Sequence, residues 1–472
     1  MESKSRPNRW RLGASERVLI LLVGDILMAV AAFLLSLYFW AAGDAWMQFS
    51  IEFITDRPPI WYFLLPLFWV ILLVELYDVH RASNPYETLK GIGLAFTIYT
   101  LIYLIIYFTS EPNSLPRRGV SFFILFAAIL TLIWRMIYIQ LFTSPRLLRR
   151  VLIVGAGKAG ETLVKVVSEQ WPPPFNVIGL VDDDPNKQGK KFGNFTVIGD
   201  SQSLIQLIKD QEITDLILAI SGEMKGNMFR SILTAQEMGV DLSIMPQVYE
   251  DLLTRVPIFL LEAEWIVRSF VEKTRTSSLY QLSKSLIDFM GGLIGIFIMM
   301  GFFPLISLAI ILESGFPIFF TQDRMGQGGQ TYKIIKFRTM DRDAERDGVI
   351  RMAEENDDRV TKFGWFLRKT HLDELPQFIN VVRGDMSLVG PRAERPVLVE
   401  YFQKQIPFYR ARLLVKPGIT GWAQINYGYA GNVDETAIKL EYDLYYIEHR
   451  NLFMDISIIL RTIWTVLGFK GQ

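Results

Sequence analysis

Long apolar runs alternate with polar segments along the first third of the chain. The runs lie at residues 18–42, 60–79, 91–109 and 119–142, and each approaches the ~20 residues that a membrane-spanning helix needs. The first run is too long for a cleaved signal peptide and lacks a small-residue cleavage site. We therefore predict a four-helix transmembrane bundle over residues 1–146.

Basic residues flank this predicted bundle and indicate its orientation. Five Lys and Arg residues lie between residues 4 and 17, and three more lie between residues 146 and 150. Because Lys and Arg concentrate on the cytoplasmic side of membrane proteins, both ends of the bundle are expected to face the cytoplasm. Arg117 and Arg118 count against this topology, since it puts them on the outer side.

Residues 147–275 have the pattern of a soluble α/β segment. VLIVGAGKAGETLVKVV (151–167) combines an apolar strand, a glycine turn and a helix, and further strands are expected at 177–185 and 215–220. This order is typical of a doubly wound sheet, and the length suits one mononucleotide-binding half. We predict a Rossmann-like α/β domain here.

The glycine turn of this segment has two interpretations. Gly155, Gly157 and Gly160 match the pattern G-x-G-x-x-G, and Asp182 lies at the end of the next expected strand. In the first interpretation a dinucleotide places its pyrophosphate at the helix N-terminus and a ribose on Asp182. In the second, the glycines serve tight turns alone. The sequence leaves both open.

A further apolar run, at residues 286–312, is as long as a spanning helix. Basic residues lie on both sides of it: Lys273, Arg275 and Lys284 before it, and Arg324, Lys333, Lys336 and Arg338 after it. Both flanks are therefore expected in the cytoplasm, and Pro304 inside the run breaks the hydrogen bonding of a helix. We predict a re-entrant helix at about 284–312, bent at Phe303–Pro304; a fifth true span, kinked at the proline, is the alternative.

The last segment, 276–472, is basic, aromatic and rich in glycine turns. Residues 439–469 mix charged with aromatic and aliphatic side chains, which predicts a helix pair. That pair lies either in the membrane interface or within the domain, and the pattern suits both.

The stretch KTHLDELPQFINVVRGDMSLVGPR (369–392) places Asp373 and Glu374 side by side. An ordinary helix would account for them. Acids in a first turn complement the helix dipole, Thr370 is placed to cap the helix, and Gly384 is placed to end it.

A chemical interpretation comes from the cations in the neighbouring motifs, which are Arg324, Lys336, Arg338 and Arg392. Carboxylates amid Arg and Lys, beside a membrane helix, suit a phosphorylated substrate that is partly lipid. Mg²⁺ would be bound through one or two carboxylates and the substrate phosphates. The chain has no cysteine, which excludes cysteine nucleophiles and zinc–thiolate sites.

Four motifs together, KFRTM, LRKTHLDELPQ, GDMSLVGPR and PGITGWAQ, resemble the bacterial sugar transferases, the monotopic polyprenyl-phosphate phosphoglycosyl transferases. The resemblance covers about residues 276–472, and the membrane runs and α/β segment make the chain similar to the large form of that family. It implies three parts: a four-helix transmembrane bundle, a Rossmann-like α/β domain, and a mainly α monotopic catalytic domain with a re-entrant membrane helix.

The resemblance also implies a reaction. Sugar-1-phosphate passes from a UDP-sugar to undecaprenyl phosphate with Mg²⁺, and UMP leaves, as the first membrane step of exopolysaccharide or O-antigen synthesis. Asp373 would be the nucleophile that forms an acyl phosphate, and Glu374 a metal ligand or a residue that orients the lipid phosphate. One departure is Phe303, since the family usually has Ser before the proline that matches Pro304.

The expected partners follow from this reaction. They are the UDP-sugar, undecaprenyl phosphate and membrane lipid, with no nucleic acid, and the expected location is the bacterial inner membrane with the active site on the cytoplasmic face. A homodimer is expected only on general grounds, because membrane proteins with a soluble α/β unit often dimerise. The residues do not identify the sugar.

Two other classes of function are alternatives to a sugar-phosphate transferase. An NAD-dependent nucleotide-sugar dehydratase needs a Tyr-x-x-x-Lys motif; Tyr280 and Lys284 have that spacing, but so do two other pairs. A non-catalytic membrane scaffold is disfavoured by the intact carboxylate pair and its cations.

Overall fold

The protein, described by a computed structural model, divides into two compact units, Met1–Asp251 and Leu252–Gln472. The structure describes residues 14–43, 48–77, 79–110, 116–142, 149–171, 173–220, 222, 224, 226–260, 278–340, 359–428 and 431–467. Within these residues four helices are long and apolar enough to cross a membrane, three in the first unit and one in the second. The segment 1–13, with most of the N-terminal basic residues, lies outside the described residues.

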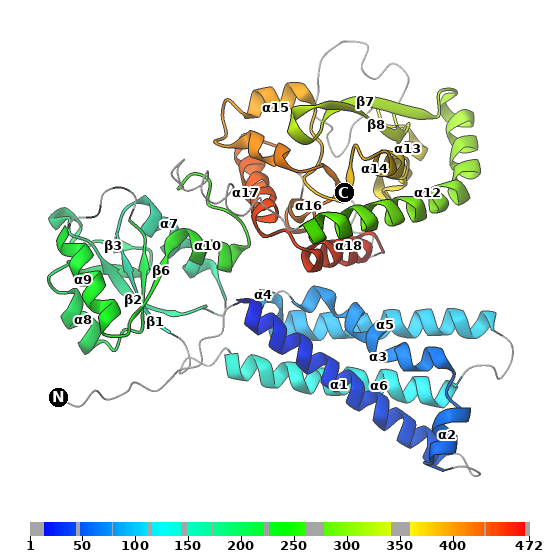
Figure 1. The fold of residues 1–472 in the computed structure, drawn as a ribbon, viewed down its shortest axis with the longest axis horizontal. Coiled ribbons are helices and arrows are strands. Elements are labelled where there is room, and N and C mark those ends of the chain that lie inside the picture. The colour runs from blue at the N-terminus through cyan, green and yellow to red at the C-terminus, as the bar shows by residue number, and fades with distance from the viewer. Residues whose placement is uncertain are drawn as a thin grey trace. The chain divides into compact units, whose positions relative to one another are not determined.

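The helical part of the first unit is built on three long helices, α1 (Ala14–Ala42), α5 (Pro85–Thr109) and α6 (Arg117–Phe142) (Figure 1). α1 and α6 are antiparallel, because Arg118 Nη1 donates to the Gly43 carbonyl at one end and Arg135 bonds Asp25 toward the other. The segments before α1 and after α6 therefore leave from the same end of the bundle. Arg117, which counted against the expected topology, lies over the Tyr107 ring.

The second expected span, 60–79, is helical but broken. It consists of η1 (Ile60–Leu64), α3 (Leu65–Leu72) and η2 (Val74–Tyr77), with α2 (Ile51–Asp56) before it and α4 (Val79–Ala82) after it. Pro59 and Pro66 lack the N–H groups that a continuous helix would use. The segment still returns the chain along the bundle, from Tyr62, which bonds Ser36, to Leu76, whose carbonyl accepts from Arg135.

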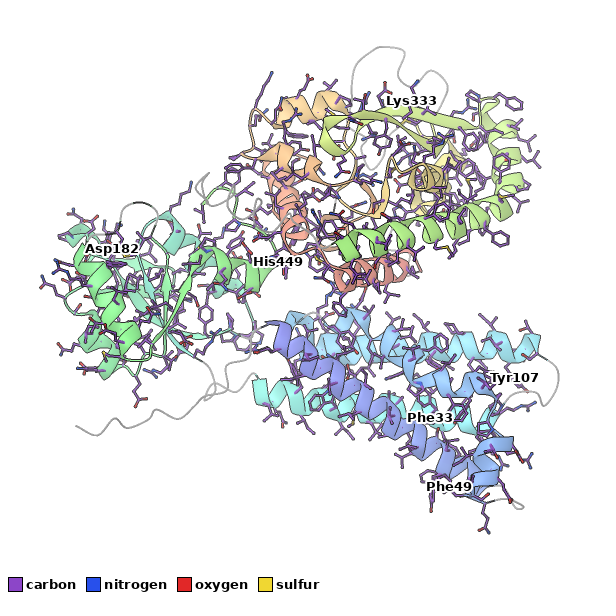
Figure 2. All side chains as sticks on the ribbon, viewed as in Figure 1. Phe33, Phe49, Tyr107, Asp182, Lys333 and His449 are labelled. Carbon is purple, nitrogen blue, oxygen red and sulfur yellow. The ribbon has the colours of Figure 1, made fainter. Side chains whose placement is uncertain are left out.

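Aromatic side chains and one ion pair hold this bundle together. Phe33 packs on Tyr62 and Phe63 with ring centroids 5.4 and 5.5 Å apart (Figure 2). Asp25 and Arg135 are fully buried and joined by hydrogen bonds of 2.6 and 3.3 Å. A buried charge in a membrane helix needs such a partner. A third bond from Arg135, to the Leu76 carbonyl, satisfies the end of the broken segment.

The α/β part of the first unit contains a six-stranded sheet in the order β3-β4-β2-β1-β5-β6. Its strands are β1 (Arg150–Val154), β2 (Asn176–Val181), β3 (Lys191–Phe192), β4 (Phe195–Gly199), β5 (Asp215–Leu218) and β6 (Asp241–Ile244). Its helical elements are α7 (Lys158–Glu169), η4 (Pro185–Lys187), α8 (Leu204–Asp210), α9 (Gly226–Glu237) and α10 (Met245–Leu253). Figure 1 shows α8 and α9 on one face of the sheet and α7 on the other. All pairings except β3–β4 are parallel, so the predicted Rossmann-like domain is confirmed.

The second unit begins its regular structure with the long apolar helix α12 (Ser278–Ser314), which contains Pro304. Figure 1 shows that α12 bends and that its two parts run in clearly different directions. Pro304 cannot donate to the preceding turn, and the Ser307 hydroxyl donates to the Phe303 carbonyl at the bend. The Phe303 ring packs on Phe319 and Phe337 of the following hairpin, with centroids 5.9 and 6.2 Å apart. The residue that departs from the family pattern therefore anchors the bend through its ring.

Short elements follow α12. The strands are β7 (Phe319–Met325), β8 (Thr331–Phe337), β9 (Ser387–Val389) and β10 (Gly418–Thr420); the single-turn elements are η5 (Gln327–Gly329), η6 (Leu372–Glu374) and η7 (Tyr409–Leu414). The helices are α13 (Lys362–Lys369), α14 (Gln377–Arg383), α15 (Pro396–Phe402), α16 (Trp422–Asn426), α17 (Val433–His449) and α18 (Leu452–Leu467). β7 and β8 form an antiparallel hairpin, and β9 and β10 pair in parallel.

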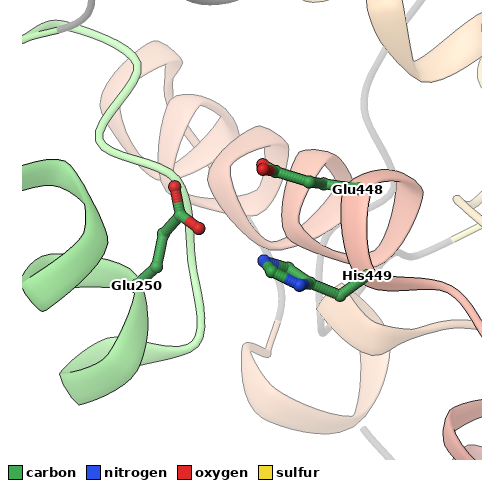
Figure 3. Close-up of side chains that lie close together, drawn as sticks. All are labelled: Glu250, Glu448 and His449. Atoms are coloured by element: carbon green, nitrogen blue, oxygen red, sulfur yellow. The ribbon is translucent and has the colours of Figure 1, made fainter. Parts of the chain in front are cut away.

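The main core of the second unit lies between α15, α16, α17 and α18. Leu440, Leu444 and Ile447 of α17 are buried there, so α17 packs within the domain. α18 differs, since its Phe453 and Ile463 are 62% and 51% exposed, which suits a membrane interface. The predicted helix pair is thus confirmed, and α17 packs within the domain, whereas a membrane-interface position for α18 stays a prediction. Figure 3 shows Glu448 and His449 at the end of α17.

Val256 and Ile258 belong to this core as well, although they precede the expected domain boundary near residue 275. The backbone N–H of Val256 donates to the Glu441 carbonyl, and Trp422 Nε1 donates to the Thr254 carbonyl. The second unit therefore begins at Leu252.

Candidate active site

The two carboxylates lie on a short turn between two helices. Asp373 and Glu374 belong to η6, which follows α13 and precedes α14. His371 starts the turn with a left-handed φ of 56°, and no side chain caps it. Thr370 is the C-cap of α13 instead, with its hydroxyl bonded to the Phe366 and Leu367 carbonyls, so its expected capping role was wrong. Gly384 ends α14 at φ 86°, as predicted.

The β7–β8 hairpin places two of the predicted cations on one face. Arg324 pairs with Tyr332 and Lys336 pairs with Phe320 across the hairpin. Because alternate residues of a strand share a face, Arg324 and Lys336 point to the same side. Gly328 and Gly329, with φ of 68° and 80°, make the turn that brings the two strands back together.

Lys336 joins the hairpin to the carboxylate pair. Its Nζ lies 2.6 Å from Glu374 Oε1 and 3.9 Å from Asp373 Oδ2. Arg392, which follows β9, places Nη2 3.3 Å from the same Glu374 oxygen. Glu374 is therefore held by two cations, whereas Asp373 faces Lys336 at a longer distance.

The two carboxyl groups consequently titrate in opposite directions. Burial raises the pKa of Asp373 above its ordinary value, against the attraction of Lys336. Burial acts in the same direction on Glu374, but the positive charges of Lys336 and Arg392 outweigh it and lower the pKa of Glu374. Two adjacent carboxylates with diverging pKa values are typical of a catalytic site.

A small, partly open pocket lies beside this cluster. Its lining includes Arg324, Lys336, Glu374 and Arg392, together with Gln377 and Gly418. Among the described residues, Nε of Arg324 has no hydrogen-bond acceptor, so this buried donor is available to a ligand. Three of the four predicted phosphate-binding residues thus meet at one pocket.

Arg338, the fourth predicted phosphate-binding residue, contacts the end of α12. Its Nη2 donates to the Ser314 carbonyl at 2.9 Å, to Ser314 Oγ at 3.0 Å, and to the Gly315 carbonyl. It therefore caps the C-terminus of α12, where carbonyls lack partners within the helix. These contacts place the Nη2 group at the helix end, and phosphate binding by Arg338 stays a prediction.

Asn380 is a supporting residue that the sequence reasoning missed. It is fully buried; its Oδ1 accepts from the Ile335 N–H at 3.1 Å and its Nδ2 donates to the Lys333 carbonyl at 2.8 Å. The amide thus binds β8 as a neighbouring strand would, which fixes Lys336 relative to the turn that carries Glu374. In the sequence, the one sign of this role was an amide residue a few positions after the carboxylate pair.

The glycine turn of the first unit supports the structural interpretation of its motif. Gly155 has a φ of 109°, and a Cβ on Gly160 would lie 2.1 Å from the Gly155 carbonyl oxygen. Asp182 accepts from the Ala156 N–H at 2.7 Å and from Lys187 Nζ at 3.0 Å. Its carboxylate is therefore engaged by its own loop, and Gly157 begins α7 without a side-chain cap.

The dehydratase motif is also structural. The Tyr280 hydroxyl donates to Asp455 at 2.9 Å, and Lys284 Nζ donates to the Val389 carbonyl at 3.2 Å. These two side chains fasten α12 to α18 and β9, so they do not form the catalytic pair of such an enzyme.

Two segments of the chain match models of known protein families. Residues 279–469 match the model of the bacterial sugar transferases, and residues 73–246 match that of a CoA-binding domain. The UDP-glucose:undecaprenyl-phosphate glucose-1-phosphate transferase of Escherichia coli is 32% identical over 68% of this chain and 68% of its own length. The chain belongs to the bacterial sugar transferase family.

Other members of the family match different shares of the chain. The UDP-N-acetylgalactosamine-undecaprenyl-phosphate N-acetylgalactosaminephosphotransferase of Aeromonas hydrophila is 43% identical over 42% of this chain and 46% of its own length. The UDP-galactose-lipid carrier transferase of Erwinia amylovora is 25% identical over 90% and 85%. The first of these matches thus spans about half of the relative. Asp373, Glu374 and Arg392 lie inside the part that matches the family model.

The carboxylate pair has the right chemistry for the Mg²⁺ ion expected from the family. Mg²⁺ prefers hard oxygen ligands, and it is usually bound by one or two carboxylates together with substrate phosphates. Asp373 and Glu374 provide those oxygens, and Glu374 lines a pocket together with Arg324, Lys336 and Arg392, which can bind phosphate. The residues present therefore fit the ion.

Proposed function

We propose that this protein transfers sugar-1-phosphate from a UDP-sugar to undecaprenyl phosphate and releases UMP, and so begins the synthesis of a surface polysaccharide. Family membership supports this activity. The observation that carries it is the arrangement at the pocket, where Lys336 and Arg392 each place a charged nitrogen within 3.3 Å of Glu374 Oε1, next to Asp373. Such a cluster can hold the phosphates of a sugar nucleotide.

Asp373 is the nucleophile in this proposal. A carboxylate with a raised pKa is the better base and the better nucleophile, and burial gives Asp373 that property. Glu374 is less suited, because two cations engage its Oε1 and lower its pKa. The local electrostatics thus separate the roles of two residues that the sequence only placed side by side.

The reaction has two steps. A carboxylate oxygen of Asp373 attacks the β-phosphorus of the UDP-sugar, and the bond from that phosphorus to the bridging oxygen breaks. UMP leaves with the bridging oxygen, and the sugar phosphate stays on Asp373 as an acyl phosphate. An oxygen of the lipid phosphate then attacks the same phosphorus, which frees Asp373 and forms the diphosphate-linked sugar lipid.

The cations make this attack feasible. A carboxylate and a diphosphate repel each other, so positive charge must neutralise the phosphoryl oxygens as the new bond forms. Arg324, Lys336 and Arg392 line the pocket and are positioned to do this. Mg²⁺ bound by the carboxylates and the phosphates would supply further positive charge.

The lipid acceptor reaches the site along α12. This helix exposes large apolar side chains, among them Phe297, Leu305 and Leu312, each more than 70% exposed. These side chains suit the membrane, and the bend at Pro304 suits a helix that enters and leaves on one face. The basic flanks of α12 support a cytoplasmic position for that face, on the side where the UDP-sugar is found.

The test is release of UMP by the purified full-length protein. The donors are UDP-glucose, UDP-galactose and UDP-N-acetylgalactosamine, which are those named for the relatives. UMP should form with at least one donor, and its accumulation should depend on added undecaprenyl phosphate and Mg²⁺. Formation of UDP instead of UMP, or no nucleotide product with any donor, would contradict the proposal.

A further inference from the structure

Asp288 is a buried carboxylate inside the apolar helix α12, and the reaction described above does not use it. It is 9% exposed and lies within the segment Ser278–Ser314 that is apolar enough to cross a membrane. An ionisable side chain in such a helix is costly and usually has a function. Its contacts show what that function is.

Asp288 binds the strand that leads to Arg392. Its Oδ1 accepts from the Leu388 N–H and from Ser387 Oγ, both at 3.0 Å. Lys284, one helical turn earlier, donates to the Val389 carbonyl at 3.2 Å and lies 3.6 Å from Asp288. Two polar residues of α12 therefore hold three consecutive residues of β9.

The segment after β9 is tightly packed as far as Arg392. Gly390 N donates to the Thr420 carbonyl at 2.9 Å, and Gly418 N donates to the Pro391 carbonyl at 2.9 Å. A Cβ on Gly418 would lie 2.1 Å from Gly390 N, so the two backbones are in close contact. A shift of β9 cannot be absorbed before Arg392, because packed segments move together.

The same face of α12 also holds the helix that follows the carboxylate pair. A Cβ on Gly292 would lie 2.7 Å from Val382, and one on Gly295 would lie 2.2 Å from the Phe378 ring. These glycines let α14 approach closely, and α14 begins three residues after Glu374. One helix face thus contacts both segments whose charged ends must meet.

We propose that Asp288 is a positioning residue that holds Arg392 against Glu374 through its hydrogen bonds to β9. This inference rests on the proposed function, in which Arg392 binds the substrate phosphates beside Glu374. Without the Asp288 acceptor, the Leu388 N–H loses its partner and the Ser387 hydroxyl keeps only the Val389 carbonyl of its own strand. α12 then no longer holds β9 in place through this carboxylate, and the 3.3 Å contact lengthens. The lipid-embedded helix then acts on the chemistry without touching the substrate.

The experiment is a double-mutant cycle on the full-length protein, with UMP release as the readout. Asp288→Ala is expected to lower kcat/KM about tenfold, within the range of coupled neighbours. Asp288→Asn should keep most activity, because its Oδ1 still accepts from the Leu388 N–H. Arg392→Lys keeps the charge but loses the Arg geometry, and Asp288→Ala should have little further effect in that background.

The controls separate this inference from the proposed function. Asp434→Ala removes an exposed acid of α17 and should leave UMP release unchanged. If the unmodified protein releases no UMP, the proposed function fails. If that protein is active, three results overturn the positioning role: Asp288→Ala has wild-type activity, Asp288→Asn is as impaired as Asp288→Ala, or the two losses multiply in the double variant.

A second variant covers the case in which Asp288→Ala does not fold. Ser387→Ala removes one of the two donors to Asp288 Oδ1 and leaves the Leu388 bond in place. It should lower kcat/KM by a smaller factor, and this loss should disappear in the Arg392→Lys background. A Ser387→Ala loss of equal size in both backgrounds, or no loss in either, overturns the proposal.

Discussion

The ammonium of Lys336 lies 2.6 Å from Oε1 of Glu374. This contact distinguishes the two adjacent carboxylates, because the Lys336 ammonium lies 3.9 Å from Asp373, farther than from Glu374. Glu374 remains ionised and bound to cations, while Asp373 keeps a raised pKa in a buried position. An acid pair that looks symmetrical in the sequence is thus asymmetrical in charge and in reactivity.

Asp373→Asn is expected to abolish turnover and leave the protein folded. The amide is close in shape to the carboxylate but cannot form the acyl phosphate, so kcat should fall more than about 100-fold. UMP release measures the loss, and size-exclusion behaviour in detergent checks the fold. Glu374→Gln serves as the comparison; it should impair turnover while still forming a covalent sugar phosphate on Asp373. Residual activity of Asp373→Asn above a hundredth would remove Asp373 from the nucleophile role.

The pH dependence of turnover should reflect the raised pKa of Asp373. Only the ionised form attacks, so activity is lost as pH falls through the pKa of this group. Because burial raises that pKa above the ordinary value of 3.8, the acid limb of kcat/KM should lie above pH 3.8. Glu374, with its lowered pKa, stays ionised over this range and should add no limb. A profile that is flat down to pH 4 would contradict this assignment.

The sequence predicted the parts of this site that lie in single motifs. The carboxylate pair, Arg392 and the glycine hairpin with Lys336 could be found because each lies within one contiguous motif. The contacts of Asp288 with β9 could not be found, because they join residues about 100 positions apart. The contacts of Arg338 with the end of α12 could not be predicted either. A basic residue that binds phosphate and one that caps a helix look identical in sequence.

The same limit explains the two differences in the first unit. The apolar run 60–79 predicted a span, and only the fold shows that prolines and the Leu76–Arg135 bond divide it. Asp182 matched the ribose-binding position of a dinucleotide motif, and its local partners Ala156 and Lys187 could not be predicted from that motif. Dinucleotide binding at this turn stays a prediction. Local patterns predict elements well, whereas partners that come from another element require the fold.

Arg338→Met should reduce stability more than substrate binding. The change removes bonds from Arg338 to the Ser314 and Gly315 carbonyls at the end of α12, and charged hydrogen bonds contribute about 1.5–3 kcal/mol each. The melting temperature should fall, while KM for the UDP-sugar should change less than about twofold. Arg324→Met is the matched control at the pocket, and there KM should rise with little loss of stability. The opposite pattern would return Arg338 to the substrate site.

The second unit should keep its activity without the first, provided that the cut is placed before Leu252. Val256 and Ile258 are each 1% exposed in the core of the second unit, and burying such a side chain contributes about 1.5–3 kcal/mol. A fragment of residues 252–472 should therefore melt at a higher temperature than one of residues 276–472, and it should release UMP. Equal stability of the two fragments would show that residues 252–260 do not support the core. A folded but inactive 252–472 fragment would show that the first unit shapes the site.

The two flanks of α12 should lie on the same, cytoplasmic face of the membrane. A straight helix with the 37 residues of α12 would be about 55 Å long, at ~1.5 Å per residue, well beyond the ~30 Å hydrocarbon core. Length therefore allows a full crossing, and the bend at Pro304 with the basic flanks decides against it. A crossing would also carry Asp373 to the outer face, away from the UDP-sugar.

Single cysteines test this directly, because the native chain has none. Ser285 and Gln327 are both exposed and lie on opposite sides of the bend. In intact cells, Ser285→Cys and Gln327→Cys should both resist an impermeant maleimide, and after lysis both should react. An unreactive cysteine after lysis would call for a neighbouring position, so Gln330→Cys, at another exposed residue of the same turn, provides a second reporter. Labelling of Gln327→Cys from outside an intact cell would show that α12 spans the membrane, and the proposed active site would then face away from its donor.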